Sequence, residues 1–469
     1  MTKTNPIICG LDIGTTKIAC FIGQRSETGK VKILGYGRTD SIGVERGVVK
    51  NIKSTSESIL KAVAMASDQA NVDVKEVYVG IAGQHIKSYT SQGELMIPED
   101  QPYIQQKDLD QLCDNQSRIM QSPGYSIIHV FPQAYCVDGE ELCDVDPIGV
   151  AGKQLRARFH IVTGNRNNIE NIAHSVRIAG LEIKGLVLEP VASALAVLDD
   201  KDLEAGVALV DIGGGTTDIA IFYDKIIRHT SVLALAGNVI TQDIRMGCNI
   251  MKNQAEALKT RFGSCLPQAV NENDIVCIPG LHGSESREIN MKTLAGIIHE
   301  RSKTILEQVG YEISVAGFEN KLISGLVLTG GGSMMKNIKE LAEYTTRCNT
   351  RIGLPDAHLD INTPEDIIHP MNSTGIGLLI YGLNEAEGKM MLEEEQELEP
   401  VSVPEPEPEP EPNPIPIPEP DPDPTEIPQA AEGGKKIRKP NNNVMKSIKD
   451  FFGKLLSDES GSAPTEDDE

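Results

Sequence analysis

Residues 11–17 read LDIGTTK and residues 210–218 read VDIGGGTTD, so one pattern occurs twice in the chain. Each copy follows a run of apolar residues and leads into a second one, IACFIG in the first case and IAIFY in the second. Two apolar runs separated by a glycine-rich turn predict two strands joined by that turn. Because the copies lie 199 residues apart in the same local context, the sequence predicts a duplicated α/β fold with two facing halves.

The first copy has the composition of a phosphate-binding loop. Asp12 ends the first apolar run, and Gly14 lets the backbone turn tightly and approach a ligand closely. The N–H groups of the turn can form a nest for phosphate oxygens. Thr15 and Thr16 add hydroxyl donors, and Lys17 adds a positive charge. Asp12 is suited to holding a hydrated Mg²⁺ ion, which keeps several of its waters.

The second copy offers the same chemistry from the opposite side. Its Asp211 supplies a second carboxylate near the metal. The residues expected to contact phosphate are Gly213, Gly214, Gly215, Thr216 and Thr217. The alternative is that both copies are glycine-rich hairpin turns capped by Asp and Thr, but the occurrence of two copies favours phosphate binding.

A third glycine-rich turn lies in LVLTGGGSMMKNIKEL, residues 326–341. An apolar run ends at Thr329, and a helix is predicted to begin near Met334. A glycine-rich turn that opens a helix lets a ligand approach the backbone. The candidate ligand contacts here are therefore Gly330, Gly331, Gly332 and Ser333. No GxxxxGK[ST] motif is present, which excludes a P-loop enzyme.

Around these loops, strand-like and helix-like segments alternate up to about residue 392, which favours an α/β architecture. Residues 54–70 are predicted to form a helix with Ser or Thr available to cap it. Residues 85–163 break the alternation, because short β-like runs surround one helical stretch near 106–120. We expect residues 85–163 to form a small inserted α+β domain.

Composition excludes several classes of protein. Lys and Arg total 44 against 68 Asp and Glu, a net charge of −24, whereas a nucleic-acid-binding protein normally carries a basic surface. The nine Cys contain no CxxC pair, so reduced thiols in a cytosol fit better than zinc sites or disulfides. No stretch approaches the ~20 apolar residues of a membrane-spanning helix. His129, His160 and His174 lack metal-binding spacing and are expected to be structural or surface residues.

The unusual charges all lie after residue 392. Residues 393–428 contain 13 Pro and 13 acidic residues, so residues 393–434 are predicted to be a disordered linker biased toward polyproline II. Residues 435–457 are basic and predict an amphipathic helix. Residues 458–469 are expected to form an acidic, disordered tail.

The predicted helix separates apolar residues from lysines. Its apolar arc consists of Val444, Met445, Ile448, Phe451, Phe452, Leu455 and Leu456, and its lysines are Lys446, Lys449 and Lys454. Such a helix favours binding to a membrane surface, with apolar residues in the acyl boundary and lysines on anionic lipid. The alternatives are docking on the body of the chain and recognition by a calmodulin-type protein.

The three loops, in this order, resemble those of the actin-like ATPase superfamily. The resemblance implies an actin-like (ribonuclease H-like) fold that binds ATP with Mg²⁺ through 12–17, 211–217 and 329–335. It also implies connecting helices near 188–198 and 371–380. Glu189 matches a residue that positions the attacking water in that superfamily, although from the sequence alone it could be a helix N-terminal charge. Glu256 and Lys259 match a pair that contacts ribose and adenine, although such pairs are common on helix surfaces.

The nucleotide loops together with the basic amphipathic helix resemble the FtsA family of bacterial cell-division proteins. Supporting stretches are GLEIKGLVLEPVASALAVL, GVALVDIGGGTTDIAIF and GLVLTGGGSMMKNIKELAE. The resemblance implies a self-assembling tether at the division site, on the cytoplasmic face of the membrane. Its implied partners are the FtsZ C-terminal tail, anionic lipid, other division proteins and further copies of itself. The long Pro/Glu linker and the acidic tail after the helix depart from the usual family pattern.

That resemblance also implies a division into subdomains. The first comprises residues 1–84 and 371–392 (1A), and the inserted 1C-type domain comprises 85–163. The second half comprises 164–238 and 318–370 (2A) together with 239–317 (2B), which binds the partner. A pilus-assembly homologue, a chaperone-type ATPase and a sugar kinase remain alternatives. The chain has no β-rich substrate domain for a chaperone, and no motif singles out a kinase's catalytic Asp.

Overall fold

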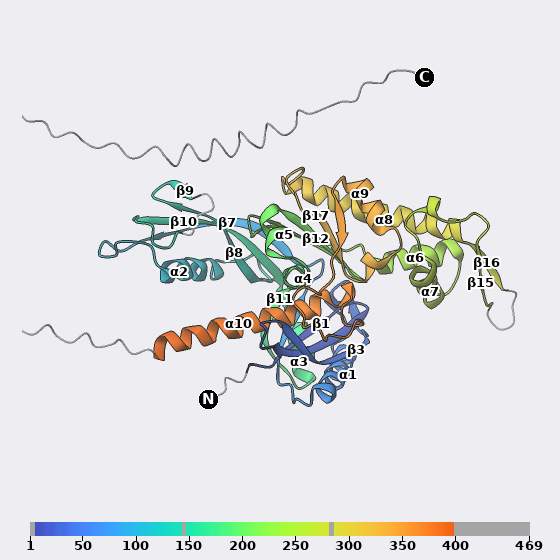
Figure 1. Ribbon diagram of the computed structural model, residues 1–469, viewed down its shortest axis with the longest axis horizontal. Coiled ribbons are helices and arrows are strands. Elements are labelled where there is room, and N and C mark those ends of the chain that lie inside the picture. The colour runs from blue at the N-terminus through green and yellow to red at the C-terminus, as the bar shows by residue number, and fades with distance from the viewer. Residues whose placement is uncertain (1–4, 143–146, 281–285, 398–469) are drawn as a thin grey trace, which may run out of the picture. The chain divides into compact units, whose positions relative to one another are not determined.

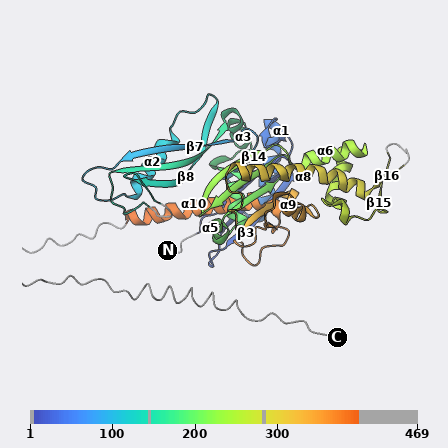
Figure 2. The same ribbon diagram turned by 90° about the horizontal axis from the view of Figure 1, so that it is seen from above.

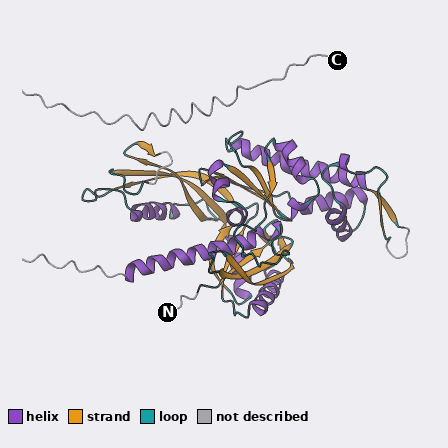
Figure 3. Ribbon diagram, viewed as in Figure 1, coloured by secondary structure: helices purple, strands orange, loops and turns teal. Residues whose placement is uncertain are grey.

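The computed structural model describes residues 5–142, 147–280 and 286–397. Figure 1 labels the elements, and Figure 3 shows their strands gathered into sheets with helices alongside. The predicted linker beyond residue 397, the predicted amphipathic helix of residues 435–457 and the acidic tail lie outside the described residues. No helix in the described ranges is long and apolar enough to cross a membrane.

The first half is built on a five-stranded sheet with the order β11-β6-β1-β2-β3. Its strands are β1 (Ile8–Ile13), β2 (Lys17–Arg25), β3 (Val31–Asp40), β6 (Glu76–Ile81) and β11 (Glu182–Leu188). Helices α1 (Ile52–Ala70) and α3 (Arg166–Ile178) share a buried apolar core with one face of this sheet. A small hairpin, β4 (Val44–Glu45) and β5 (Val48–Val49), precedes α1.

The second half repeats this plan with a sheet of order β14-β13-β12-β17-β18. Its strands are β12 (Val207–Ile212), β13 (Thr217–Tyr223), β14 (Ile226–Leu233), β17 (Gly325–Thr329) and β18 (Thr350–Ile352). Its helices are α5 (Asp200–Ala205), α6 (Gly237–Cys248), α7 (Lys252–Phe262), α8 (Met291–Val315) and α9 (Ile338–Thr346), with a short hairpin of β15 (Ile275–Ile278) and β16 (Arg287–Asn290).

The duplication predicted from the sequence is confirmed by strand register. Asp12 pairs with Ala19 across the β1–β2 hairpin, and Asp211 pairs with Asp218 across β12–β13. Both hairpins therefore turn through loops of equal length. In this register Lys17 corresponds to Thr216, so the Thr-Thr pair of the second copy lies two positions later than that of the first.

Two helices lie between the sheets. Helices α4 (Glu189–Val197) and α10 (Ser373–Glu397) share one buried core with apolar residues of both sheets, including Phe21 and Leu209. These helices occur where the sequence predicted the two connections between the halves. Helix α10 continues to Glu397, so the predicted linker boundary at residue 393 lies inside it. Figures 1 and 2 show α10 running toward the side on which the inserted domain lies.

The inserted α+β domain is confirmed. Its four-stranded sheet has the order β7-β10-β8-β9. The elements are β7 (Lys87–Met96), α2 (Gln106–Ser117), β8 (Tyr125–Val137), β9 (Glu140–Leu142) and β10 (Gln154–Asn165). It has its own apolar core, in which Leu112, Leu155 and Phe159 are buried.

Two local predictions were wrong. Helix α1 begins at Ile52 rather than at residue 54, and its cap is Asn51, whose side chain accepts a hydrogen bond from the N–H of Ser54 (3.0 Å). A short 3₁₀ segment (Gly331–Met334) within the third glycine-rich turn precedes α9, which begins at Ile338 rather than near Met334. The left-handed backbone of Asn337, with a φ of 64°, separates the two.

Candidate nucleotide site between the two halves

The two predicted phosphate loops touch each other. A Cβ atom added to Gly214 would lie 1.8 Å from Thr16 Oγ1, and one added to Gly215 would lie 2.3 Å from Thr15 Oγ1. Only glycine leaves room for the first loop at these positions. The structure therefore brings together loops that are far apart in the sequence, one from each half.

Two opposite charges lie next to each other in the first loop. Lys17 forms an ion pair with Asp12, and both side chains are largely buried. The N–H of Gly47, in the β4–β5 turn, donates to Thr15 Oγ1 (3.0 Å). Lys17, the cation predicted for this loop, is thus paired with Asp12, the carboxylate predicted to hold the metal.

Both connecting helices hold the carboxylate of the second loop. Ser193 Oγ of α4 donates to Asp211 Oδ2 (2.8 Å), and Thr374 Oγ1 of α10 donates to the same oxygen (3.1 Å). Burial raises the pKa of Asp211, the charge of Asp12 raises it further, and the two hydroxyl donors oppose this. Neither Ser193 nor Thr374 was predicted, because their contacts depend on how the helices pack.

Asp218 is a site residue that the sequence analysis missed. Its Oδ2 accepts a hydrogen bond from Thr216 Oγ1 (2.9 Å), but its Oδ1 is buried without a hydrogen-bond partner. Burial raises the pKa of Asp218 to about 8, and the charges of Asp211 and Asp12 contribute. The last residue of VDIGGGTTD was the available signal, since a hairpin of this length places it opposite Asp211.

Glu189 lies near these carboxylates, whose charges affect its pKa. It is the first residue of α4, and its Cγ would be 3.0 Å from a Cβ atom on Gly80. Burial holds its pKa well above the usual range, with further contributions from Asp12, Asp218 and Asp211, while Lys17 acts in the opposite direction. Its predicted role in positioning water stays a prediction.

The third loop packs directly on the second. Gly330 has a φ of 79°, and a Cβ atom there would lie 2.2 Å from Asp211 Oδ1. Ser333 is buried, and its hydroxyl donates to the carbonyl oxygen of Gly330 (2.7 Å). Ser333 therefore has a contact inside its own loop, and its predicted contact with a ligand stays a prediction.

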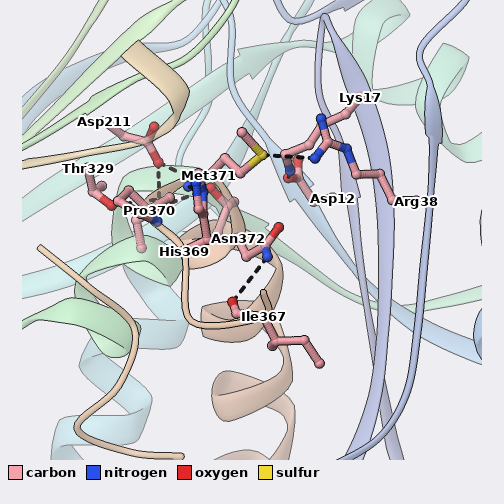
Figure 4. A network of polar contacts seen from close by, with 12 residues as sticks. Asp12, Lys17, Arg38, Asp211, Thr329, Ile367, His369, Pro370, Met371 and Asn372 are labelled. Carbon is pink, nitrogen blue, oxygen red and sulfur yellow. Dashed lines mark hydrogen bonds and ion pairs between the residues drawn. The ribbon is translucent and has the colours of Figure 1, made fainter. Parts of the chain in front are cut away.

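Residues 370–371 link the first half to the third loop (Figure 4). Arg38 Nη1 on β3 donates to the sulfur of Met371 (3.0 Å). Thr329 Oγ1 donates to the carbonyl oxygen of Pro370 (3.3 Å), and the N–H of Gly330 donates to the same oxygen (3.2 Å). Nothing in the sequence singled out Arg38 or Pro370.

The predicted Glu256–Lys259 pair is not an ordinary surface pair. Lys259 is buried, and its Nζ donates to Gly237 O (3.0 Å), Thr241 Oγ1 (2.9 Å) and Glu256 Oε2 (2.8 Å). Burial lowers its pKa. The N–H of Gly237 donates in turn to the carbonyl oxygen of Gly213 (3.1 Å). Lys259 therefore supports the end of α6 that rests on the second phosphate loop.

The carboxylates of this site fit a hydrated cation better than a directly bound one. In the part of the chain that the structure describes, no group of three or more His, Cys, Asp or Glu side chains is arranged to hold a metal ion. Yet the charges of Asp12 and Asp211 raise the pKa values of both Glu189 and Asp218, and Asp218 Oδ1 has no partner. A divalent cation held through waters would relieve this repulsion.

A duplicated α/β fold with facing glycine-rich loops between its halves defines a protein of the actin-like ATPase superfamily. A chain of the solved PilM–PilN type IV pilus biogenesis complex has the same fold, with a TM-score of 0.57, 15% identity and coverage of 81% of this chain and 99% of that chain. The family profile described as Hsp70 protein matches residues 165–226.

The chain belongs to the family of the cell division protein FtsA. The profile described as Cell division protein FtsA matches residues 208–377, and that of the SHS2 domain inserted in FtsA matches residues 83–163. FtsA of Pseudomonas aeruginosa is 35% identical over 391 residues, covering 83% of this chain and 92% of its own. FtsA of Escherichia coli K12 is 32% identical over 384 residues, covering 80% of this chain and 90% of its own.

Proposed function

We propose that this chain binds ATP with Mg²⁺ between its two halves. The observation that carries the proposal is the contact between the two glycine-rich loops, where Gly214 meets Thr16 and Gly215 meets Thr15. Backbone N–H groups from both loops are the phosphate ligands that such turns supply. A nucleotide bound there would be held by both halves at once, so its binding would depend on how the halves are arranged.

Each group of side chains has a proposed role. Lys17 and the two loops are assigned to neutralising and orienting phosphate, while the third loop, Glu256 and Lys259 are assigned to contacts with the nucleoside. Asp12 and Asp211 hold the waters of the cation, and Asp218 joins them. Bound Mg²⁺ would supply the positive charge that stabilises the phosphate oxygens.

We propose that ATP turnover is slow. We assign to Glu189 the role of accepting a hydrogen bond from a water near the phosphate. Its carboxyl has a raised pKa when no cation is bound. A protonated carboxyl cannot act as a base, so turnover requires a bound cation to favour its ionised form.

At the level of the cell, we propose that the chain tethers FtsZ filaments to the cytoplasmic face of the membrane and helps recruit later division proteins. Membership of the FtsA family supports this, together with the basic amphipathic sequence of residues 435–457. Residues 239–317 are the proposed site for the FtsZ tail. Self-assembly into a filament would present many helices at once, so weak individual binding would become strong.

Sedimentation with liposomes tests the tether. The full chain should sediment with anionic liposomes and carry a labelled FtsZ tail peptide with it. Phe451→Asp and Phe452→Asp place a charge in the predicted apolar arc and should release the chain from lipid, whereas Ser447→Asp on the polar side should change binding less. If lipid binding survives both Phe substitutions, the predicted helix is not the anchor.

A further inference from the structure

An arginine on β3 shares a face of the first sheet with the lysine of the first phosphate loop. Arg38 lies opposite Ala19 in the antiparallel pairing of β2 and β3, and Lys17 comes two residues before Ala19 on β2. Residues two apart on a strand point to the same face, and so do residues directly opposite each other on neighbouring strands. The register therefore places both cations on one face of the sheet, where Figure 4 shows them.

The two cations differ in their partners. Lys17 forms an ion pair with Asp12, so much of its charge is already neutralised. Arg38 is exposed, and among the described residues its guanidinium donates only to the sulfur of Met371 (3.0 Å). A thioether is a weak acceptor, whereas a phosphate oxygen forms a charge-assisted and often bidentate hydrogen bond with arginine. A phosphate within reach of Arg38 would therefore compete well with Met371.

The contact with Met371 directs Arg38 toward the third loop. A Cβ atom on Gly331 would lie 4.0 Å from Met371 Cβ. The residue before Met371 is also fixed to this loop, because the N–H of Gly330 donates to the carbonyl oxygen of Pro370 (3.2 Å). The guanidinium of Arg38 therefore lies at the point where the first half meets the third loop.

His369 belongs to the same group of side chains but does not add a positive charge. Burial lowers its pKa, and the charges of Arg38 and Lys17 lower it further, so the three groups are close enough to interact. Its Nδ1 accepts a hydrogen bond from the N–H of Met371 (3.3 Å), as a neutral ring does. Arg38, rather than His369, therefore supplies additional positive charge beside the first loop.

We propose that Arg38 exchanges Met371 for the phosphate chain of the bound nucleotide and contacts the phosphates that ADP and ATP share. The proposal rests on the nucleotide site proposed above and adds to it a ligand contact from β3. Lys17 belongs to a loop assigned to phosphate, and Met371 packs on the loop assigned to the nucleoside. A cation between these two loops meets the phosphates next to the nucleoside rather than the terminal one.

Calorimetric titration of the full chain with ADP and with ATP, each with Mg²⁺, tests this contact. Arg38→Ala should weaken the binding of both nucleotides by about tenfold, because each loses a charge-assisted hydrogen bond. Arg38→Lys keeps the charge but not the planar fork, so it should lose less affinity. Lys32→Ala, at an exposed position of the same strand, is the matched control and should bind both nucleotides as the wild type does. Thermal midpoints without nucleotide check that each variant is folded.

Two further measurements separate a contact with phosphate from a structural role. The affinity for ADP should depend less steeply on salt concentration in Arg38→Ala than in the wild type or in Lys32→Ala, because one contact between charges has been removed. Met371→Leu keeps the apolar volume but removes the sulfur. Arg38 then has no partner to leave, so this variant should bind ADP at least as tightly as the wild type.

The proposal is overturned if Arg38→Ala binds ADP with wild-type affinity, if it loses affinity for ATP alone, or if its salt dependence is unchanged. It is also overturned if Met371→Leu loses as much affinity as Arg38→Ala, because Arg38 would then act through its contact with Met371. A wild-type chain that binds neither nucleotide would instead contradict the proposed nucleotide site itself, and this contact with it.

Discussion

Asp218 lies directly opposite Asp211 in the β12–β13 hairpin, and both carboxylates are buried. One oxygen of Asp211 receives two hydroxyl donors, whereas Asp218 receives one and leaves its other oxygen without a partner. Two adjacent buried carboxylates are difficult to ionise together. The carboxylates of Asp211 and Asp218 should therefore hold a proton when no cation is bound. Once that proton dissociates, they should bind a cation.

The pH dependence of stability should reveal this proton. The pKa of Asp218 is about 8 in the folded chain, above its ordinary value of 3.8, so the folded state binds more protons than the unfolded state between these values. The contribution of Asp218 to the free energy of unfolding should then fall as pH rises from about 4 to about 8. Asp218→Asn removes this contribution, so denaturant titrations without nucleotide should show a shallower decline and a more stable chain at pH 8.

Asp110→Asn, at an exposed position of α2, is the matched control and should leave the pH profile unchanged. If Asp218→Asn leaves the pH dependence of stability unchanged, the buried carboxylates are ionised even without a cation.

The contact between the loops should make Gly214 intolerant of a side chain. Gly214→Ala places a methyl group against Thr16, which should cost about 1–3 kcal/mol of stability and weaken nucleotide binding. Adding Thr16→Ala should restore part of the lost stability, which chemical denaturation of the single and double variants measures.

Gly310→Ala in α8 provides the comparison, because a Cβ atom there would meet no atom within 4 Å apart from the helix's own adjacent backbone. In a helix interior this change should stabilise the chain by about 0.5–1 kcal/mol. Simple additivity of Gly214→Ala and Thr16→Ala would mean that the two loops are not in contact.

Hydrolysis should depend on Glu189 more than binding does. We expect wild-type turnover well below the enzyme median of about 10 per second. Glu189→Gln keeps the size of the side chain but cannot accept a proton, so turnover should fall by about 100-fold while ATP affinity changes little. Phosphate release and calorimetry measure the two quantities separately, and equal turnover in the variant and the wild type would remove Glu189 from the reaction.

Features encoded by local sequence could be predicted. Glycine, Asp and Thr in DIGTTK and DIGGGTTD report a tight turn and its donors directly, and the inserted domain was visible as a break in the alternation of segments. The connecting helices were located through their resemblance to a known superfamily. All of these have a signature within a short stretch of chain.

Features that depend on tertiary contacts could not be predicted. Asp218 acquires its role from the residue opposite it in the hairpin, and Lys259 from the burial of its helix against α6. Ser193 and Thr374 meet only because α4 and α10 pack together between the sheets. Asn51 caps α1 although Ser and Thr lie nearby, because it is the residue whose extended backbone precedes the first turn.

The most direct test of a nucleotide site between the halves is calorimetric titration of the full chain with ATP and Mg²⁺. Lys17→Ala removes the cation of the first loop and Asp12→Ala removes its partner, so each should weaken ATP binding by about tenfold or more. Lys53→Ala, at an exposed position of α1, should bind as the wild type does. Omitting Mg²⁺ should weaken ATP binding by the wild type. The ATP affinity of the wild type should then be closer to that of Asp12→Ala. If both loop variants bind ATP with wild-type affinity in the presence of Mg²⁺, the nucleotide is not held between the two halves.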